Sequence, residues 1–530
     1  MPIARNPDLS AAAAATWKPT AFWILLGLAA RTLIAFLVPL LPDETYYWDW
    51  SRHLHAGYFN HPPGIALVIR VGTEAVGNNV FGVRIGPAIL ALIVHVSLVI
   101  VTARISVVKD GVRAAVVMAL IPFATLGLVI ATPDAPLLAS ASVALLCLER
   151  ALNAPCRSRA CIGWWVLTGV ALGAALLSKY TAILLPGAFF IACIVYAPLR
   201  VRLREPGPWL AALVALVMFL PVIAWNANSD WISFRFQLNH GFGVAPRGAP
   251  ITRELEMVGG QLGLATPILS VLLILAVLFT AWHEWSRRSE TLPATKDSTR
   301  FAFGIIALVP IIFFAVSAWR RPIEPNWPAL SYPAAVVLLA TMPNRWARAR
   351  MWKSGLLLAT TVLAVAVLQV WQPILPIEPR ADPIGHAHGW PTLANAVDRA
   401  RQDAFLEGTV TRWVAANRYQ DASELAFHLP DQPQVFSLNL NGRANQYDLW
   451  EVAGERIRPV DGLVAAFDAT PRGDSLAMVV GAWFTQSQRG ETVELRRGEG
   501  VVETRRVWMY RGAKNIPRRH SQLPMSARRR

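Results

Sequence analysis

The sequence is poor in charge and in cysteine, and it lacks the short motifs that hold catalytic metals or nucleotides. Only 16% of its 530 residues are charged. The cysteines are Cys147, Cys156, Cys161 and Cys193, all in or beside apolar runs, so no disulfide framework is expected. HExxH and CxxC sequences are missing, and no glycine-rich loop joins a strand to a helix. These absences argue against the zinc, thiol and nucleotide sites that such motifs build.

The chain is rich instead in long apolar runs. Hydrophobic residues make up 54% of it, and runs of about 18 residues, enough to cross a bilayer, recur along its length. Spans are expected at about 21–41, 82–103, 112–131, 135–150, 163–178, 181–198, 208–226, 256–283, 301–319, 326–342 and 353–372. Short or re-entrant segments bring the expected number to between about 11 and 13 transmembrane helices. The first run is interpreted as a retained helix, and 62–77 as a segment along the membrane interface.

Lysine and arginine gather in alternate loops between these runs. The basic loops contain Arg104, Lys109 and Arg113; Arg150, Arg157 and Arg159; Arg200, Arg202 and Arg204; Arg287, Arg288, Lys296 and Arg300; and Arg345, Arg348, Arg350 and Lys353. Cytoplasmic loops carry this excess of positive charge, so the pattern predicts a cytoplasmic N-terminus. An odd number of spans then places the chain after Trp371 outside. The net charge of +16 follows from this topology and does not indicate nucleic-acid binding.

The character of the chain changes after Pro373, where a proline-bearing linker begins. We expect helices at 391–407 and 419–428, and strands at 409–415, 434–440, 475–484 and 491–511. This mixture predicts a small soluble α/β domain. The expected domains are therefore a transmembrane domain over 1–372, a periplasmic domain over 373–513 and a basic, disordered tail over 514–530.

Most of the unusual residues fall in the outer loops, beginning with Leu41–Pro63. Asp43 and Glu44 follow the first span, and a carboxylate near the hydrocarbon boundary is costly unless it is used or paired. They are candidates for a general base or for ligands of a divalent cation such as Mg²⁺ or Mn²⁺. The structural alternative is an acidic loop that caps the next helix. Tyr46 and Tyr47 suit either substrate contact or an interfacial aromatic belt.

Two further outer positions carry candidate chemistry. Pro62 and Pro63 fix the backbone after Asn60 and His61, so the imidazole could donate a hydrogen bond to a phosphate. Its structural alternative is an interfacial histidine in a rigid turn. Asp134 starts a helix after a Thr-Pro pair and is either part of a shared outer site or a first-turn acid.

Several cations lie outside against the charge rule. They are Lys179, Arg320 and Arg321. Arg253, in the expected outer loop 227–255, is grouped with them. Together they could surround a phosphate or diphosphate, although each alone is also typical of a cation that reaches lipid headgroups. Arg84 is a weaker candidate. Arg31 falls near the middle of the first span and needs an interior partner.

These motifs in combination resemble the bacterial branch of the protein O-mannosyltransferase superfamily. The matching segments are Pro42–Trp48, Gly57–Pro63, Thr132–Asp134, Leu177–Tyr180, Asn326–Ala329, Ser423–Leu429 and Gly442–Asp448. That branch includes lipid A aminoarabinose transferases and rhizobial lipopolysaccharide galacturonosyltransferases. The resemblance implies a GT-C fold, a helical bundle with a periplasmic domain that uses a polyprenyl-phosphate-linked sugar.

The resemblance also assigns roles to residues. It implies that Asp43, Glu44 and Asp134 are catalytic, with His61 at the position of a phosphate-contacting lysine in aminoarabinose transferases. The His-Pro-Pro sequence favours the galacturonosyltransferase-like branch. The expected phosphate ligands are His61, Lys179, Arg253, Arg320 and Arg321, and the expected substrate contacts are Tyr46, Tyr47, Asn60, Arg84 and Trp327.

The expected function is inverting transfer of a sugar from polyprenyl phosphate to lipid A or lipopolysaccharide core, at the periplasmic face of the bacterial inner membrane. One alternative is transfer to protein serine or threonine. Another is a transporter or flippase for a lipid-linked substrate, which the clustering of charge at one face and the lack of an inverted repeat disfavour. A sensor or scaffold whose soluble domain binds a partner is the remaining alternative.

Overall fold

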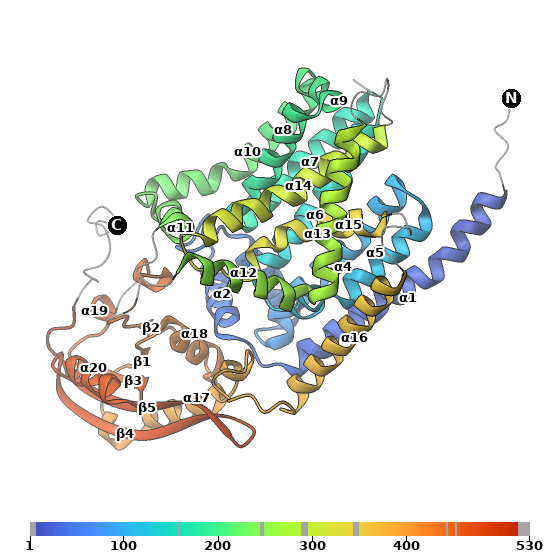
Figure 1. Ribbon diagram of the computed structural model, residues 1–530. Coiled ribbons are helices and arrows are strands. Elements are labelled where there is room, and N and C mark those ends of the chain that lie inside the picture. The colour runs from blue at the N-terminus through green and yellow to red at the C-terminus, as the bar shows by residue number, and fades with distance from the viewer. Residues whose placement is uncertain are drawn as a thin grey trace. The chain divides into compact units, whose positions relative to one another are not determined.

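The computed structural model describes residues 7–155, 158–243, 249–287, 295–342, 349–440, 442, 444–450 and 453–517. Its contacts divide the chain into two compact units (Figure 1). The helical unit comprises the residues up to Ala35, His61–Trp225 and Phe234–Val367. The α/β unit comprises Phe36–Asn60, Asn226–Ser233 and the residues from Leu368 onward. The first outer loop and the C-terminal part of the chain thus belong to one compact unit.

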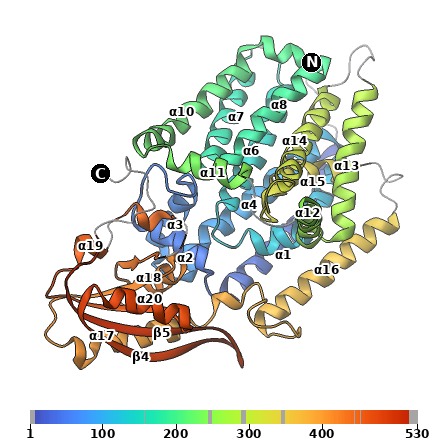
Figure 2. The same ribbon diagram turned by 60° about the vertical axis from the view of Figure 1, so that its left-hand side comes forward.

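The helical unit is built mainly from long helices. Its elements are α1 (Pro7–Leu37), α3 (Gly64–Val76), α4 (Val80–Ile105), α5 (Val108–Leu120), η1 (Phe123–Gly127), α6 (Asp134–Asn153), α7 (Arg159–Ser178), η2 (Tyr180–Ile183), α8 (Leu184–Val195), α9 (Ala197–Arg200), η3 (Val201–Arg204), α10 (Pro206–Asn228), α11 (Ile232–Phe242), α12 (Pro250–Ala265), α13 (Pro267–Ser286), α14 (Thr295–Ala318), η4 (Trp327–Ser331), α15 (Tyr332–Ala340) and α16 (Ala349–Trp371). Neighbours α6 and α7 run side by side in both ribbon views (Figure 2).

Eight of the described helices are long and apolar enough to cross a membrane, or nine with the bent pair formed by 180–195 and 197–204. They include parts of α1, α4, α6, α7, α10, α13, α14 and α16. The predicted spans 112–131 and 326–342 fall on the shorter helices α5 and α15. The expected total of 11 to 13 therefore stays a prediction, while the mainly helical, polytopic architecture is confirmed.

Two breaks divide helices where the hydropathy pattern is continuous. The predicted span 256–283 is two helices, because Thr266 has a positive φ of 64° and Pro267 starts α13 without an N–H group. The second break is the π-helix η1, which follows α5 at Pro122. Arg31 of α1 binds the freed backbone there, with Nε and Nη2 donating to Ala124 O at 2.9 and 2.7 Å. This is the interior partner that the sequence required for Arg31.

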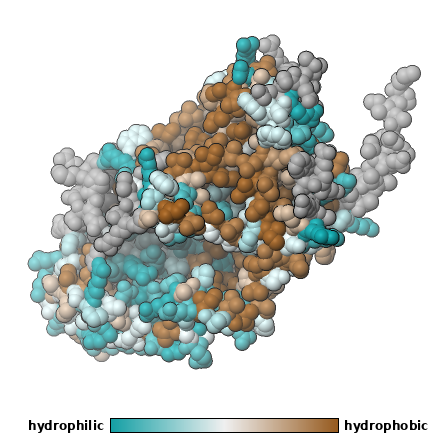
Figure 3. Space-filling view, in the orientation of Figure 1, coloured by the Kyte–Doolittle hydropathy of each residue, from teal (hydrophilic) through white to brown (hydrophobic). Residues whose placement is uncertain are grey.

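The outer surface of the helical unit is apolar. The face drawn in Figure 3 is largely brown over the long helices, and the exposed side chains include Leu213, Leu216, Val217 and Leu220 of α10, and Ile274, Leu275 and Leu278 of α13. A soluble protein rarely exposes such contiguous apolar surface. Helices with all backbone groups bonded internally and apolar side chains outside suit a lipid environment.

The α/β unit contains a five-stranded mixed sheet in the order β2-β1-β3-β5-β4. Its elements are α2 (Pro42–Arg52), η5 (Gly385–Ala387), α17 (Trp390–Gln402), η6 (Ala404–Leu406), β1 (Arg412–Ala416), α18 (Tyr419–His428), β2 (Val435–Ser437), η7 (Gln446–Asp448), α19 (Ala453–Arg456), β3 (Gly462–Asp468), α20 (Pro471–Gly481), β4 (Phe484–Arg497) and β5 (Gly500–Ala513). Strands β1, β2 and β3 are parallel, and β5 pairs antiparallel with both β3 and β4. The β4–β5 hairpin is the long curved ribbon in Figure 1.

The sheet confirms part of the sequence prediction and corrects the rest. The predicted helix at 419–428 coincides with α18, and 491–511 falls on the β4–β5 hairpin. The predicted strand at 475–484 was wrong, because Thr470 caps α20 there by accepting from Gly473 N. Strand β3 was missed, because its buried, alanine-containing sequence Gly462–Asp468 has no polar alternation.

Candidate active site

Helix α2 starts at the acidic pair of the first loop. Pro42 occupies its first turn, and Asp43 and Glu44 lie where the helix dipole favours negative charge. Glu44 is buried, and its Oε2 accepts a hydrogen bond from Leu41 N at 2.9 Å. Asp43 is exposed. Glu44 therefore stabilises the start of the helix, as the capping alternative expected, and Asp43 is the carboxylate that remains accessible.

The aromatic side chains after this pair bind α2 to the rest of the α/β unit. The Tyr46 hydroxyl donates to Asn60 Oδ1 at 3.1 Å and accepts from Gln446 N at 2.8 Å. Its ring centroid lies 4.5 Å from that of Tyr419. Tyr46 and Tyr47 are both buried. The predicted substrate contacts Tyr46 and Asn60 are thus bonded to each other, and Tyr46 is also bonded to η7.

One buried carboxylate in α2 was not a candidate in the sequence. Asp49 Oδ2 accepts a hydrogen bond of 2.7 Å from the Tyr447 hydroxyl, and Arg52 lies 3.4 Å from Oδ1. Burial raises the pKa of Asp49, while Arg52 and the Tyr447 hydroxyl oppose that rise. The contact joins residues almost 400 positions apart in the sequence, about a turn before the end of α2. It fixes the orientation of the helix that carries Asp43.

In the helical unit, Asp134 is the centre of a buried polar cluster. It is the first residue of α6, and its Oδ1 pairs with Lys179 Nζ at 2.9 Å, just after the last turn of α7. Its Oδ2 accepts from Asn326 Nδ2 at 2.6 Å, just before η4. Two predicted residues, Asp134 and Lys179, are therefore in direct contact. Asn326 completes the cluster.

His61 lies in the same electrostatic environment. Burial, together with the nearby charges of Lys179 and His240, lowers its pKa to about 3. The imidazole is therefore neutral at physiological pH. In this state His61 can donate a hydrogen bond to a phosphate but adds no positive charge to the site.

The predicted arginines lie in the first turn of α12 and in the segment after α14, and Arg253 and Arg321 bind backbone carbonyls. Arg253 donates to Ala318 O at 3.1 Å and to Trp319 O at 2.7 Å. Arg321 donates to the carbonyl of Asn239. Arg320 is exposed. The buried Arg84 lies apart from these segments, with Nη1 donating to Ala35 O at 3.2 Å.

Trp327 lies beside the buried polar cluster of Asp134, Lys179 and Asn326. Its ring centroid lies 5.2 Å from that of His240 and 5.8 Å from that of Phe314, and Trp327 directly follows Asn326. Sequence reasoning did not assign a role to His240 or Asn326. The available signal was their position, since both fall in outer loops and Asn326 precedes the Trp-Pro-Ala sequence.

The helices that carry the cluster also enclose an apolar cavity. Its volume is about 360 Å³, and its lining includes Ala141 and Leu145 of α6, Leu172 of α7 and Phe190 of α8. Ala141 lies seven residues after Asp134, which is about 10 Å along a helix. An apolar chain lying in this cavity would therefore pass close to the Asp134–Lys179 pair.

Asp43 and Glu44 are the residues that the sequence offered as ligands for a divalent cation. No group of three or more His, Cys, Asp or Glu side chains that could hold a metal occurs within the described ranges. The described cysteines Cys147, Cys161 and Cys193 are buried thiols. Cys156 and several residues named above, among them Arg157, Arg288, Arg345 and Arg348, lie outside the described residues, as does most of the predicted basic tail.

Comparison with known proteins gives a consistent result. The family described as dolichyl-phosphate-mannose-protein mannosyltransferase matches residues 60–225. A lipid A galacturonosyltransferase of Rhizobium johnstonii is 27% identical over 335 residues, which cover 62% of this chain and 64% of that protein. The undecaprenyl phosphate-alpha-4-amino-4-deoxy-L-arabinose arabinosyl transferase of Pseudomonas paraeruginosa is 31% identical over 393 residues, 67% of either chain. The matches thus span about two thirds of these relatives.

One solved structure has a similar fold over nearly the whole length of both chains. ArnT from Cupriavidus metallidurans, bound to undecaprenyl phosphate, superposes with a TM-score of 0.58 at 17% identity, covering 92% of this chain and 97% of that one. Helical bundle and α/β unit together define a polytopic membrane protein of the GT-C fold. The chain belongs to the bacterial branch of the dolichyl-phosphate-mannose-protein mannosyltransferase superfamily, with the galacturonosyl and aminoarabinose transferases among its relatives.

Proposed function

We propose that the protein is an inverting glycosyltransferase that moves a sugar from polyprenyl phosphate to lipid A or lipopolysaccharide core. The observation that carries this proposal is the buried Asp134–Lys179 pair at the end of helices that line an apolar cavity. A polyprenyl-phosphate donor needs such a combination, because its tail is apolar and its headgroup is anionic. The named relatives act with the same class of donor or on lipid A.

The proposed reaction is a single displacement. The acceptor hydroxyl oxygen forms a bond to the anomeric carbon, and the bond between that carbon and the phosphate oxygen breaks with its electrons going to the phosphate. The hydroxyl proton passes to a carboxylate, for which exposed Asp43 is our candidate, with Glu44 holding the start of its helix. Asp134 is assigned a role in holding the acceptor. No step is assigned to a metal ion.

Stabilisation of the leaving phosphate is assigned to the cations of the helical unit. Lys179 supplies the positive charge, and neutral His61 supplies a hydrogen bond. Arg320 is the exposed arginine of the predicted set and suits a second charge contact. Arg253 and Arg321 order the loops through their carbonyl contacts and are assigned a supporting role.

The proposed location is the bacterial inner membrane with the reaction on the periplasmic face. The alternation of basic loops supports a cytoplasmic N-terminus and a periplasmic α/β unit. A donor already carried across the membrane suits this side, since cytoplasmic nucleotide sugars do not reach it. Protein O-glycosylation is the second candidate, favoured by the match of residues 60–225 to the protein mannosyltransferase family.

Mass spectrometry of the cell envelope tests the proposal. Lipid A, core oligosaccharide and glycoproteins are compared between cells lacking the gene and the same cells complemented with the wild type or with Asp43→Asn. We expect one sugar residue to be missing from lipid A or core in the deletion strain and in the variant, with the variant still present in the membrane. A sugar missing from protein alone favours the second candidate. Identical glycolipids and glycoproteins in all strains would overturn the proposal.

A further inference from the structure

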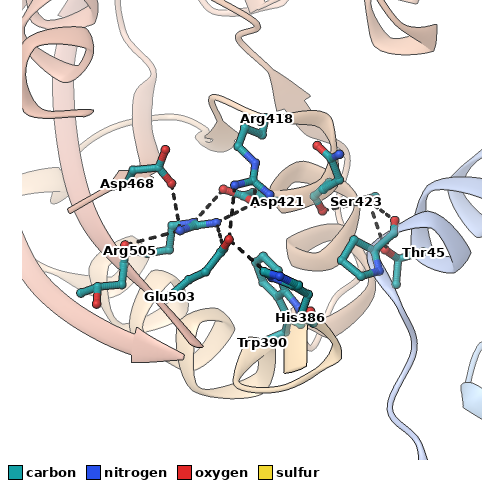
Figure 4. A network of polar contacts seen from close by, with 12 residues as sticks. Thr45, His386, Trp390, Arg418, Asp421, Ser423, Asp468, Glu503 and Arg505 are labelled. Carbon is teal, nitrogen blue, oxygen red and sulfur yellow. Dashed lines mark hydrogen bonds and ion pairs between the residues drawn. The ribbon is translucent and has the colours of Figure 1, made fainter. Parts of the chain in front are cut away.

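Helix α18 packs against α2 and presents a buried glutamate to it. Ser423 Oγ lies 3.0 Å from Thr45 Oγ1, so the two hydroxyls are hydrogen-bonded across the helix pair (Figure 4). The next residue, Glu424, is completely buried and has Thr45 and Glu44 as neighbours on α2. Two buried carboxylates from different helices, Glu44 of α2 and Glu424 of α18, are thus neighbours, and Glu44 directly follows Asp43 in α2.

Glu424 has little to compensate a negative charge. Neither of its carboxylate oxygens makes a hydrogen bond of ordinary geometry within the described part of the chain. His428 Nδ1 lies 3.3 Å from Oε2, but the same nitrogen is 3.1 Å from the Glu424 carbonyl oxygen. Burying an ionised carboxylate without strong partners is costly, and a second carboxylate nearby increases the cost.

The first turn of α18 is also held by an ion network. Asp421, in the first turn of α18, pairs with Arg505 at 2.8 Å, and Arg505 also pairs with Asp468 at 2.9 Å (Figure 4). Arg505 is only 2% exposed. Because β5 and β3 fix α18 in this way, repulsion that arises at Glu424 acts mainly on α2.

We propose that Glu424 is a positioning residue whose protonation state sets how tightly α2, and with it Asp43, is held against α18. The neutral carboxyl is compatible with buried Glu44, whereas the ionised form repels it and loosens the contact between the helices. The consequence for catalysis rests on the role of Asp43 in the proposed function. The coupling between Glu424 and α2 does not depend on that role.

The electrostatic environment of Glu424 places its change of protonation state near neutral pH. Burial raises the pKa of Glu424 to about 7, with Glu44 acting in the same direction and His428 and Thr45 opposing it. On the elements packed against α18, Asp43 of α2 is exposed and three other charged residues are paired elsewhere. Arg399 and Arg401 of α17 pair with Glu491 and Asp431, and Asp49 of α2 binds Arg52 and Tyr447.

Hydrogen–deuterium exchange of the full-length protein in detergent micelles tests the coupling. Exchange of the segment 42–52 is followed from pH 5.5 to 8.5 and corrected for the intrinsic pH dependence. The variants are Glu424→Gln, which mimics the neutral acid, and Glu407→Gln, an exposed control in the same unit. In the wild type and the control, exchange should rise by about fivefold or more through pH 7, which corresponds to about one kcal/mol of repulsion. In Glu424→Gln this step should be missing.

A second variant keeps the test informative if Glu424→Gln folds poorly. His428→Gln removes a group that lowers the Glu424 pKa, so the midpoint of the step should move to higher pH. Superimposable curves for the wild type and Glu424→Gln, or an unmoved midpoint in His428→Gln, would overturn the proposal. A step that persists in a protein without sugar-transfer activity would refute the proposed function and leave the coupling standing.

Discussion

Asp134 and Lys179 form an ion pair of 2.9 Å between Oδ1 and Nζ, with side-chain exposures of only 6% and 9%. The two residues are 45 positions apart and lie at the start of α6 and just after the end of α7. Such a pair is a weak source of stability, because removing both charges from water costs about as much as their attraction returns. Its position at the ends of α6 and α7, two helices that line the apolar cavity, favours a catalytic reason for its presence.

Breaking this pair from one side should harm both folding and activity. Asp134→Asn leaves Lys179 buried without its counter-charge, and we expect a loss of about 3 kcal/mol or more in the free energy of unfolding. The double variant Asp134→Asn with Lys179→Met should recover most of that loss without recovering sugar transfer. Thermal unfolding in detergent and envelope mass spectrometry provide the two measurements. Transfer restored in the double variant would mean that the pair is only structural.

Asn326 should be sensitive to the kind of replacement. Its Nδ2 donates to Asp134 Oδ2 at 2.6 Å. Asn326→Ala removes one hydrogen bond to a buried carboxylate, with an expected cost of about 1–3 kcal/mol. Asn326→Asp places a second acid beside Asp134 and should reduce transfer more strongly, because it competes for Lys179. The comparison of the two variants at equal protein level measures this difference, and equal effects on transfer would count against the electrostatic explanation.

Protonation of His61 should not contribute to the pH dependence of the transfer rate. Its pKa is lowered to about 3 by burial and by Lys179, so its charge does not change between pH 5 and 8. His61→Gln retains a hydrogen-bond donor and should lower the rate of transfer without changing the shape of its pH profile in that range. Transfer measured in membrane vesicles over pH 5–8 checks this. Loss of an inflection near the ordinary histidine value would show that His61 titrates during turnover.

Tyr447→Phe should destabilise the protein, and more so at high pH. The Tyr447 hydroxyl donates to Asp49 Oδ2 at 2.7 Å and lowers the pKa of this acid against the raising effect of burial. Without the hydroxyl, ionised Asp49 is less well stabilised, so the cost of about 1–3 kcal/mol applies only where Asp49 is charged. Thermal unfolding at acidic and alkaline pH gives the comparison. An equal loss at both pH values would assign the effect to packing.

Local patterns predicted the helices and several site residues but not their long-range pairing. Hydropathy placed the long helices, and Asp134 and Lys179 were both expected at a shared outer site because each lies in an outer turn, although their direct ion pair was not predicted. The contact with Asn326 could not be derived, since it crosses 192 positions. Likewise, α2 was assigned to the transmembrane domain from its neighbours in sequence, whereas Thr45 binds Ser423 across 378 positions.

The two errors of secondary-structure prediction in the α/β unit have different physical causes. Strand β3 is buried along nearly its whole length, so its sequence shows no period of two. The residues of α20 are mixed in character, and its N-cap at Thr470 was the signal that was overlooked. Glu44 stays a candidate catalytic carboxylate, and its bond to Leu41 N could not be predicted from the sequence because it depends on the helix geometry at that point.

Glu424 should make the stability of the protein depend on pH. Its pKa is raised from 4.5 to about 7 in the folded protein, so its contribution to stability is complete below pH 4.5 and is lost as the pH rises through 7. This shift corresponds to about 3 kcal/mol at most. Glu424→Gln stays neutral, so it should match the wild type near pH 5 and have the higher melting temperature near pH 8.5. Scanning fluorimetry at both pH values, with Glu407→Gln as the unchanged control, measures the difference. A variant less stable than the wild type at pH 8.5 would show that ionised Glu424 makes favourable contacts, which contradicts the repulsion assigned to it.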